Sequence, residues 1–166
     1  MNRAASRTAQ YPLFAEFVIS TNEWVYDSVS LAAVTLGSTV ALSTDPLQPG
    51  LSGLAANTIV FDAIPLPVGA VIAGGEVVVE TAVTGSTAYT VSVGIAGNTT
   101  ALASSVAGTA AAGTRTALTM TAPMVANAGQ NVRLTIAYTV ANATAGKVRV
   151  RVQYTIDGRG NEVQVS

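Results

Sequence analysis

The chain has 166 residues, of which 49% are hydrophobic and only 10% are charged, and its formal net charge at pH 7 is −1. It contains neither cysteine nor histidine, which excludes disulfides, catalytic triads that use either residue, and zinc sites built from them. The length suits one domain with its own core, and a surface with so few charges is typical of a subunit that packs against copies or partners.

The first twelve residues, MNRAASRTAQYP, are polar and lack hydrophobic periodicity. They include Arg3, Arg7 and Tyr11 but no apolar segment of the kind that a signal peptide needs, so we expect no secretion by a signal peptide. The composition predicts an extended N-terminal arm at 1–12 ahead of a single domain at 13–166. Two interpretations of the arm stay open: an end without a role, or a segment that orders against a partner.

Two early strands are predicted at 13–20 and 24–27, with a turn between them. The second of them begins with the single tryptophan of the chain, Trp24. A lone tryptophan is more often part of a core or an interface than a platform for a sugar ligand, but Trp24 and Tyr26 are candidates for such a platform.

A weak strand is predicted at 35–42, followed by a connection rich in turn residues and by a strand at 59–64 that two prolines end. A turn is expected over 67–75. Strands then follow at 75–84 and 88–95, and the tight turn between them predicts a hairpin.

The segment 96–130 consists almost wholly of Ala, Thr, Gly and Ser. It predicts long loops with one or two weak strands, of which the best lies at 116–121. Its Ser, Gly and Thr content argues against a stable helix around 101–112.

The clearest period-2 alternation of apolar and polar residues occupies 132–140 and 148–156. The connection at 141–146 suits a hairpin turn, so a second hairpin is predicted here. Such a hairpin cannot bury its apolar face alone and needs a second layer from the rest of the chain. With regular strand spacing and no helical period, the sequence predicts an all-β antiparallel β-sandwich of about eight strands, most consistent with a jelly roll.

Charge is distributed unevenly along the chain. Residues 11–109 carry seven acidic residues and no lysine or arginine, whereas most basic residues lie in the C-terminal part. We therefore expect Arg133, Arg149 and Arg151 to face the acidic residues of the strand at 75–84, or to meet the acidic half across a subunit interface. A nucleic-acid stripe is the weaker interpretation, because no aromatic residue interleaves with this basic row and the chain is slightly acidic.

No motif assembles a catalytic or cofactor site. The acids are scattered singly rather than in the spacing of a calcium loop, no phosphate-binding loop is present, and nothing nominates a carboxylate pair for glycoside hydrolysis. We expect no enzymatic activity, no cofactor, no metal and no nucleic-acid partner. We also expect no membrane partner, because the longest apolar segment has the composition of a strand.

A resemblance to a known family covers about residues 57–162. The run AGGEVVVETAVTGSTAYTVSVGIAGNTTALASS, an Ala/Gly/Thr spacer and the run GKVRVRVQYTIDGRGNE together resemble a module of tailed-bacteriophage virion proteins. Its marks are Gly-Gly, a valine-rich strand with an acid and Thr-Ala, an SVG strand, and an alternating R-V-x-Y strand.

The resemblance implies a capsid decoration or cement protein on the capsid exterior, which binds the lattice of the major capsid protein. Members of this group resemble one another in forming homotrimers over lattice junctions and in using a terminal arm as a clasp. The alternative is a β-sandwich of a tail or head fibre that recognises a host-surface glycan. On this interpretation the candidate partner-binding residues are Arg3, Arg7, Tyr11, Trp24, Arg133, Arg149 and Arg151.

Overall fold

The computed structural model describes residues 12–29, 31–37, 58–119, 124–126, 131–139 and 143–156. These residues form strands and turns and contain no helix. In chain order the strands are β1 (Leu13–Ser20), β2 (Trp24–Asp27), β3 (Ala32–Thr35), β4 (Thr58–Pro65), β5 (Ala70–Thr84), β6 (Ala88–Ile95), β7 (Asn98–Ala107), β8 (Arg115–Ala117), β9 (Met124–Ala126), β10 (Asn131–Thr139) and β11 (Ala145–Ile156).

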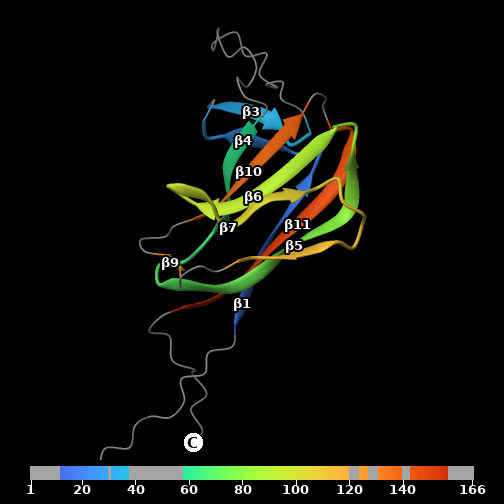
Figure 1. Cartoon of the computed structure of the whole chain (residues 1–166). Helices are drawn as coiled ribbons and strands as arrows, with labels where there is room; N and C mark the ends of the chain where they lie inside the picture. Colours follow the sequence, from blue (N-terminus) through green and yellow to red (C-terminus); the bar gives the residue numbers. More distant parts are fainter. Residues whose placement is uncertain are drawn as a thin grey trace, which may run out of the picture.

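Two antiparallel sheets pack face to face as a sandwich (Figure 1). The first sheet has the order β1-β11-β5-β8, with β9 also paired to β5, and the second has the order β4-β10-β6-β7. Strands β2 and β3 form a small separate sheet. The predicted all-β antiparallel sandwich is confirmed, while jelly-roll connectivity stays a prediction. The strands outnumber the expectation because four of them have only three or four residues.

Both predicted hairpins are wrong, although all four of their strands exist. Strands β5 and β6 lie in different sheets, and so do β10 and β11. The pairs that form are β11 with β5 and β10 with β6. Each predicted hairpin is therefore an arch whose two strands face each other across the core. Alternation identifies the buried side of a strand, but it does not say whether the next strand lies beside it or opposite it.

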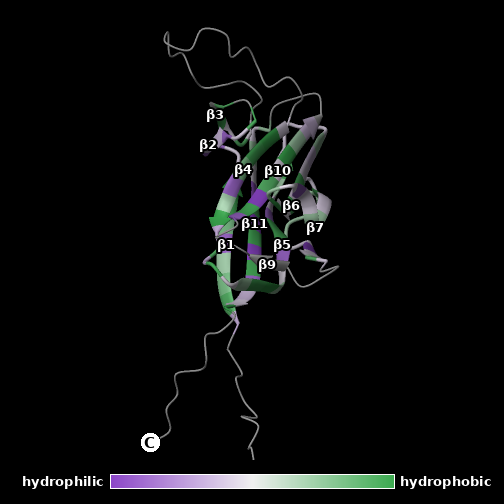
Figure 2. Cartoon of the chain, turned by 90° about the vertical axis from the view of Figure 1, so that its left-hand side faces the viewer, coloured by the Kyte–Doolittle hydropathy of each residue, from purple (hydrophilic) through white to green (hydrophobic). Residues whose placement is uncertain are grey.

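The core lies between the two sheets and consists of the inward side chains that the alternation predicted. Figure 2 shows the resulting bands of hydrophobic and hydrophilic residues along β10 and β11. Removing these side chains from water is the main stabilising contribution to the sandwich. The fully buried side chains on these two strands are Val132, Leu134, Ile136, Val148, Val150 and Val152.

The Ala-, Thr- and Ser-rich segment is more ordered than its composition predicts. It supplies β7, which pairs with β6 and buries Leu102 and Val106, and the expectation of no helix around 101–112 is confirmed. Only β8 falls near the strand expected at 116–121. Small residues form strands here because a neighbouring strand offers them backbone partners, a context that propensity does not contain.

Two other boundaries differ from the prediction. Strand β5 begins at Ala70 rather than at Gly75, since the turn is tighter: the Ala70 N–H donates to the Pro67 carbonyl at 3.1 Å. The weak strand predicted at 35–42 overlaps β3 only at Thr35, because Leu36 and Gly37 lie in a turn, and its remainder from residue 38 on lies outside the described residues.

Two buried tyrosines tie the segment after β3 to the second sheet. The hydroxyl groups of Tyr89 and Tyr138 both donate to the carbonyl oxygen of Leu36, at 3.1 and 2.5 Å. The two rings meet edge to face with centroids 5.1 Å apart. Burial raises the pKa of both phenols above the ordinary value.

Replacing Tyr89 by Phe should lower the free energy of unfolding by about 1 kcal/mol, because one of two donors to a buried carbonyl is lost. The raised folded-state pKa means that the stability contributed by each phenol is present below the unfolded pKa of about 10 and is lost as the pH rises above it. We therefore expect stability to fall above pH of about 10 in the wild type, and to fall less steeply in Tyr89→Phe.

Urea unfolding between pH 8 and about 11 measures both effects, with Tyr154→Phe on β11, where the tyrosine is only half-buried, as the control. An alkaline slope in Tyr89→Phe as steep as that of the wild type would contradict the expectation.

Candidate interaction surface

Four of the six exposed large apolar side chains of the described residues lie on the β2–β3 hairpin. Trp24 is 67% exposed and Tyr26 is 56% exposed, and they occupy the same face of β2. Val29 and Leu31, in the connection to β3, are 72% and 58% exposed. We call these four residues the hairpin surface. Exposed apolar groups concentrated in this way are typical of a surface that binds a partner.

The other face of β2 anchors this hairpin to β4. Val25 packs against the core, and Asp27 is fully buried. A carboxylate oxygen of Asp27 accepts a hydrogen bond from the Val60 N–H at 2.6 Å, and the Ser28 N–H and hydroxyl both donate to the Val60 carbonyl at 2.7 Å. The alternation of the strand thus places the aromatic residues toward solvent because their neighbours are held by the sandwich.

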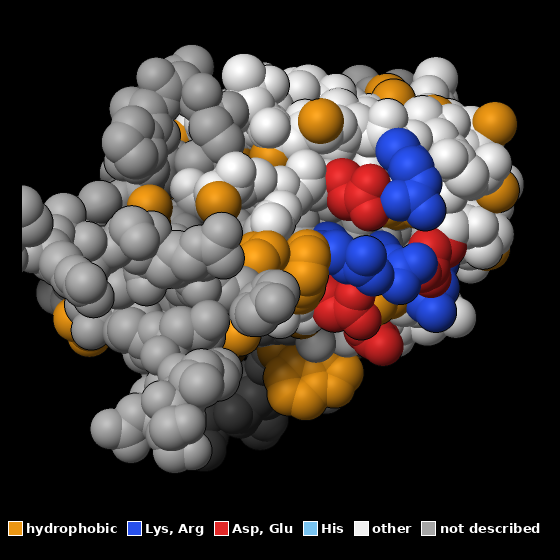
Figure 3. All heavy atoms as spheres, turned by 90° about the horizontal axis from the view of Figure 1, so that it is seen from below, with side chains coloured by type: hydrophobic (Ala, Val, Ile, Leu, Met, Phe, Trp, Pro, Cys, Tyr) orange, Lys and Arg blue, Asp and Glu red, His pale blue; other side chains and the backbone are white. Residues whose placement is uncertain are grey.

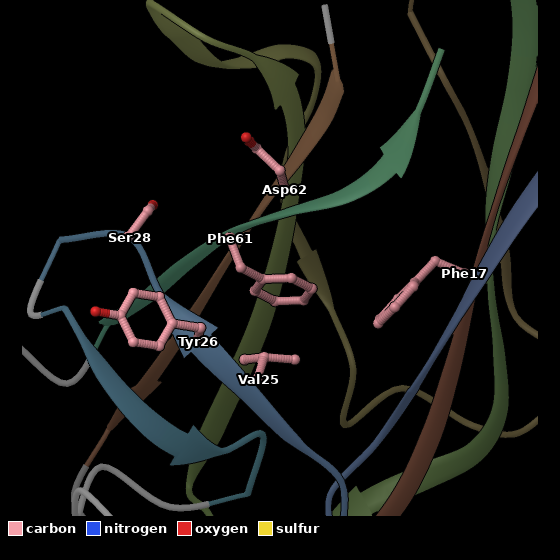
Figure 4. Close-up of a pocket in the computed structure, with 6 residues that line it drawn as sticks. All are labelled: Phe17, Val25, Tyr26, Ser28, Phe61 and Asp62. Atoms are coloured by element: carbon pink, nitrogen blue, oxygen red, sulfur yellow. The ribbon is translucent and has the colours of Figure 1, made fainter.

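An open hollow of about 380 Å³ lies beside the hairpin, between β1, β2 and β4 (Figure 4). Figure 4 shows the ring of Phe61 facing the ring of Phe17, and the two rings are in contact, with centroids 5.5 Å apart. Val25 and Tyr26 complete the apolar wall, and the polar Ser28 and Asp62 also line the hollow. Such a lining suits an apolar side chain better than a charged ligand.

The basic row of β11 lies on the outer face of the first sheet, among acids from β1 and β5 (Figure 3). Arg149 contacts Glu80 at 2.6 Å and Glu16 at 3.9 Å, and Arg151 contacts Glu16 at 3.3 Å. Lys147 contacts Glu80 at 3.2 Å. The acids of the N-terminal half and the bases of the C-terminal half are therefore strand neighbours, as predicted.

On the second sheet, Arg133 pairs with Asp62 of β4 rather than with an acid of β5. The Arg133 Nε donates to the carboxylate at 2.7 Å, and the Asn131 side-chain amide adds a longer bond of 3.3 Å. The hydrogen bond from Arg133 holds the pKa of the Asp62 carboxyl below its ordinary value, against a smaller opposing effect of burial. The acid expected opposite the basic row, Glu76, pairs with Arg115 of β8 at 2.7 Å.

The four predicted partner-binding residues that the structure describes, Trp24, Arg133, Arg149 and Arg151, thus do not form one site. Of the two interpretations of Trp24, core or interface, its exposure contradicts the core, and the interface stays a prediction. The arginines of β10 and β11 form ion pairs within the sandwich, which leaves less of their charge for a partner. The candidates in the arm lie outside the described residues: Arg3, Arg7 and Tyr11.

Sequence reasoning missed the hollow, because its walls come from strands far apart in the chain. Phe17 and Phe61 belong to the strands predicted at 13–20 and 59–64, and nothing in the sequence places these two strands side by side. Their approach at the open side of the sandwich depends on β1 and β4 being edge strands of opposite sheets. Only the order of strands within the sheets contains that information.

The residues that the structure describes do not bring together three or more acidic side chains in a way that would hold a metal ion. The same part of the chain has no helix that is both long and apolar enough to cross a membrane.

Comparison with known proteins gives little beyond the fold. No protein-family model and no curated protein sequence matches the chain. Among solved structures, a similar one is described as "Cyanophage Pam1 capsid asymmetric unit"; the match has 20% sequence identity and a TM-score of 0.48, and it covers 94% of this chain and 97% of that chain. Similarity at this level says nothing of activity or partners.

Proposed function

We propose that this chain is a structural protein of a bacteriophage virion that decorates the capsid exterior by binding the lattice of the major capsid protein. The observation that carries the proposal is the sequence resemblance over about residues 57–162, with its Gly-Gly, SVG and R-V-x-Y marks. The proposal includes no enzymatic activity and no cofactor. It keeps a homotrimer and an N-terminal clasp at 1–12 as its expected assembly.

The exposed apolar side chains of the hairpin surface also support the proposal. A free monomer gains nothing from four large apolar side chains in water, whereas a subunit that covers them on a lattice removes them from solvent. The charged groups of β11 are already paired within the chain, so the hairpin surface is the better candidate for the contact with the shell.

The test is co-sedimentation of the purified full-length chain with shells assembled from the major capsid protein of the same virus. We expect binding to shells and none to unassembled capsid protein, and a higher melting temperature of the shell once it is decorated. The double variant Trp24→Ser with Tyr26→Ser should weaken binding about tenfold or more. Val68→Ser, at a similarly exposed site in another turn, is the matched control and should bind as the wild type does.

Failure of the wild-type chain to sediment with shells that lack it would overturn the proposal. If the hairpin variant and the Val68 variant bind equally well, the hairpin surface is not the contact with the shell, and another part of the chain must make that contact.

The alternative, a fibre domain that recognises a host-surface glycan, is favoured by one observation. Trp24 and Tyr26 are exposed on the same face of one strand, and aromatic faces presented in this way stack on sugar rings. A glycan array probed with the wild type and with Trp24→Ser distinguishes the two functions. Signals that disappear in the variant would support the fibre, and an array without signals would contradict it.

A further inference from the structure

In the part of the chain that the structure describes, strand β1 has one edge with which no other strand pairs. It pairs with β11 along its whole length, from Leu13 opposite Tyr154 to Ser20 opposite Lys147, and it is the outermost strand of the first sheet. Within the described residues, the backbone hydrogen bond on its outer side is the one from the Glu23 N–H to the Ser20 carbonyl oxygen at 3.0 Å, at the very end of the strand. The facing edge of the second sheet differs, because β2 covers β4 through the hydrogen bonds to Val60.

The apolar hollow opens directly beside this unpaired edge. The contacting rings of Phe17 of β1 and Phe61 of β4 line it together. A strand added to the edge of β1 would run along the hollow, and its inward side chains would alternate with its outward ones. The inward side chain nearest Phe17 would then pack in the hollow against the two rings, which already contact each other.

On the outer face of the sheet, β1 carries the partly exposed carboxylate of Glu16. The Glu16 side chain is 50% exposed even though it contacts Arg151 and Arg149 at 3.3 and 3.9 Å. An uncharged strand would leave Glu16 without a partner on that side, whereas a basic side chain beside it would be attracted. A charge on an exposed edge also disfavours random pairing with other strands.

Strand β11, which pairs with the other edge of β1, indicates which kind of sequence can pair with β1. Glu16 is opposite Arg151, Phe17 is opposite Val150 and Val18 is opposite Arg149. Strand β11 is therefore an example, within this sheet, of a strand with alternating apolar and basic residues that pairs with β1. A strand on the free edge of β1 would lie beside the same β1 side chains.

We propose that the free edge of β1 binds an extended segment of a partner protein in which apolar and basic residues alternate. The segment adds a strand to the first sheet, packs one apolar side chain into the hollow against the rings of Phe17 and Phe61, and places a basic side chain beside Glu16. Backbone hydrogen bonds supply affinity, and the hollow and Glu16 select the sequence. This site goes beyond the proposed function, and it shares with the hairpin surface only Tyr26, which lines the hollow.

The probe is a capped, fluorescein-labelled peptide with the sequence of residues 147–154, KVRVRVQY, and the readout is its fluorescence anisotropy with the full-length protein. We expect saturable binding that weakens about threefold in Glu16→Gln and about tenfold in Glu16→Lys. A peptide with both arginines replaced by Glu should bind Glu16→Lys better than it binds the wild type. Glu76→Lys, on the same sheet but two strands away from β1, is the matched control and should bind the original peptide as the wild type does.

Two peptides with N-methyl groups on alternate residues test backbone pairing, since each blocks one edge of the added strand. We expect one of them to lose binding and the other to keep it. The proposal is overturned if the original peptide does not bind, if Glu16→Lys and Glu76→Lys weaken binding equally, or if both N-methylated peptides bind as the original does. None of these results bears on co-sedimentation with shells, so the site and the proposed function fail independently.

Discussion

A disulfide between β6 and β10 is expected to form completely and to raise the free energy of unfolding by about 4 kcal/mol, the amount that loop-closure entropy gives for a crosslink of this span. The double variant Thr90→Cys with Ala137→Cys joins register partners on adjacent strands. The chain has no cysteine of its own to compete. Urea unfolding of the oxidised and reduced forms measures the effect.

The matched control joins the strands that the sequence predicted to be a hairpin. In that hairpin Ala137 would lie opposite Arg151, so Ala137→Cys with Arg151→Cys would form a disulfide. In the sandwich the two residues belong to different sheets and point away from the shared core, which is too far for a bond between them. Free thiols are therefore expected, and a disulfide in this variant would contradict the topology.

Replacing Gly94 by Ala should lower the free energy of unfolding by about 3 kcal/mol, near the upper end for overpacking a well-packed site. A Cβ at this position would lie 2.2 Å from the carbonyl oxygen of Asn98 and 2.3 Å from the carbonyl carbon of Thr99. Both are backbone atoms of the adjoining strand, so they can move only if the β6–β7 pairing opens. Thermal and urea unfolding of the purified variant provide the measurement.

Gly97, in the turn of the same hairpin, is the control. Its φ of +85° favours glycine, but no atom lies within 4 Å of an added Cβ. Gly97→Ala should therefore cost only the backbone strain, about 1 kcal/mol. Equal losses in the two variants would mean that the close approach at Gly94 does not limit stability.

The residues that carry the resemblance to virion proteins have structural roles in this chain. A Cβ on Gly75 would lie 2.2 Å from the carbonyl oxygen of Arg151, so this glycine lets β5 and β11 approach each other. Gly94 does the same for β6 and β7, and Arg149 binds Glu80 within the first sheet. The motif therefore describes how strands pack. The hairpin surface and the free edge of β1 lie before residue 57, outside the range of the resemblance.

The uneven distribution of charge predicted that acidic and basic strands are neighbours, but it did not identify the pairs. Arg151 is opposite Glu76 in the register, yet the carboxylate of Glu76 bonds to Arg115. Long side chains on a sheet can reach more than one neighbour, so the pairing depends on every strand nearby. Arg115 comes from a three-residue strand whose position the composition does not reveal.

The sequence by itself determined the fold class and the buried side of each strong strand. Alternation is a property of single strands, and the residues that it placed inward on β6, β10 and β11 form the core. Only the tertiary structure decided which strands pair. Two consecutive strands can bury their apolar sides in either of two arrangements: paired in one sheet, or in two sheets that face each other. Which arrangement forms depends on all the strands of the domain. The hollow, the free edge of β1 and the exposed Trp24 follow from that choice, which is why the candidate surfaces emerged only from the folded chain.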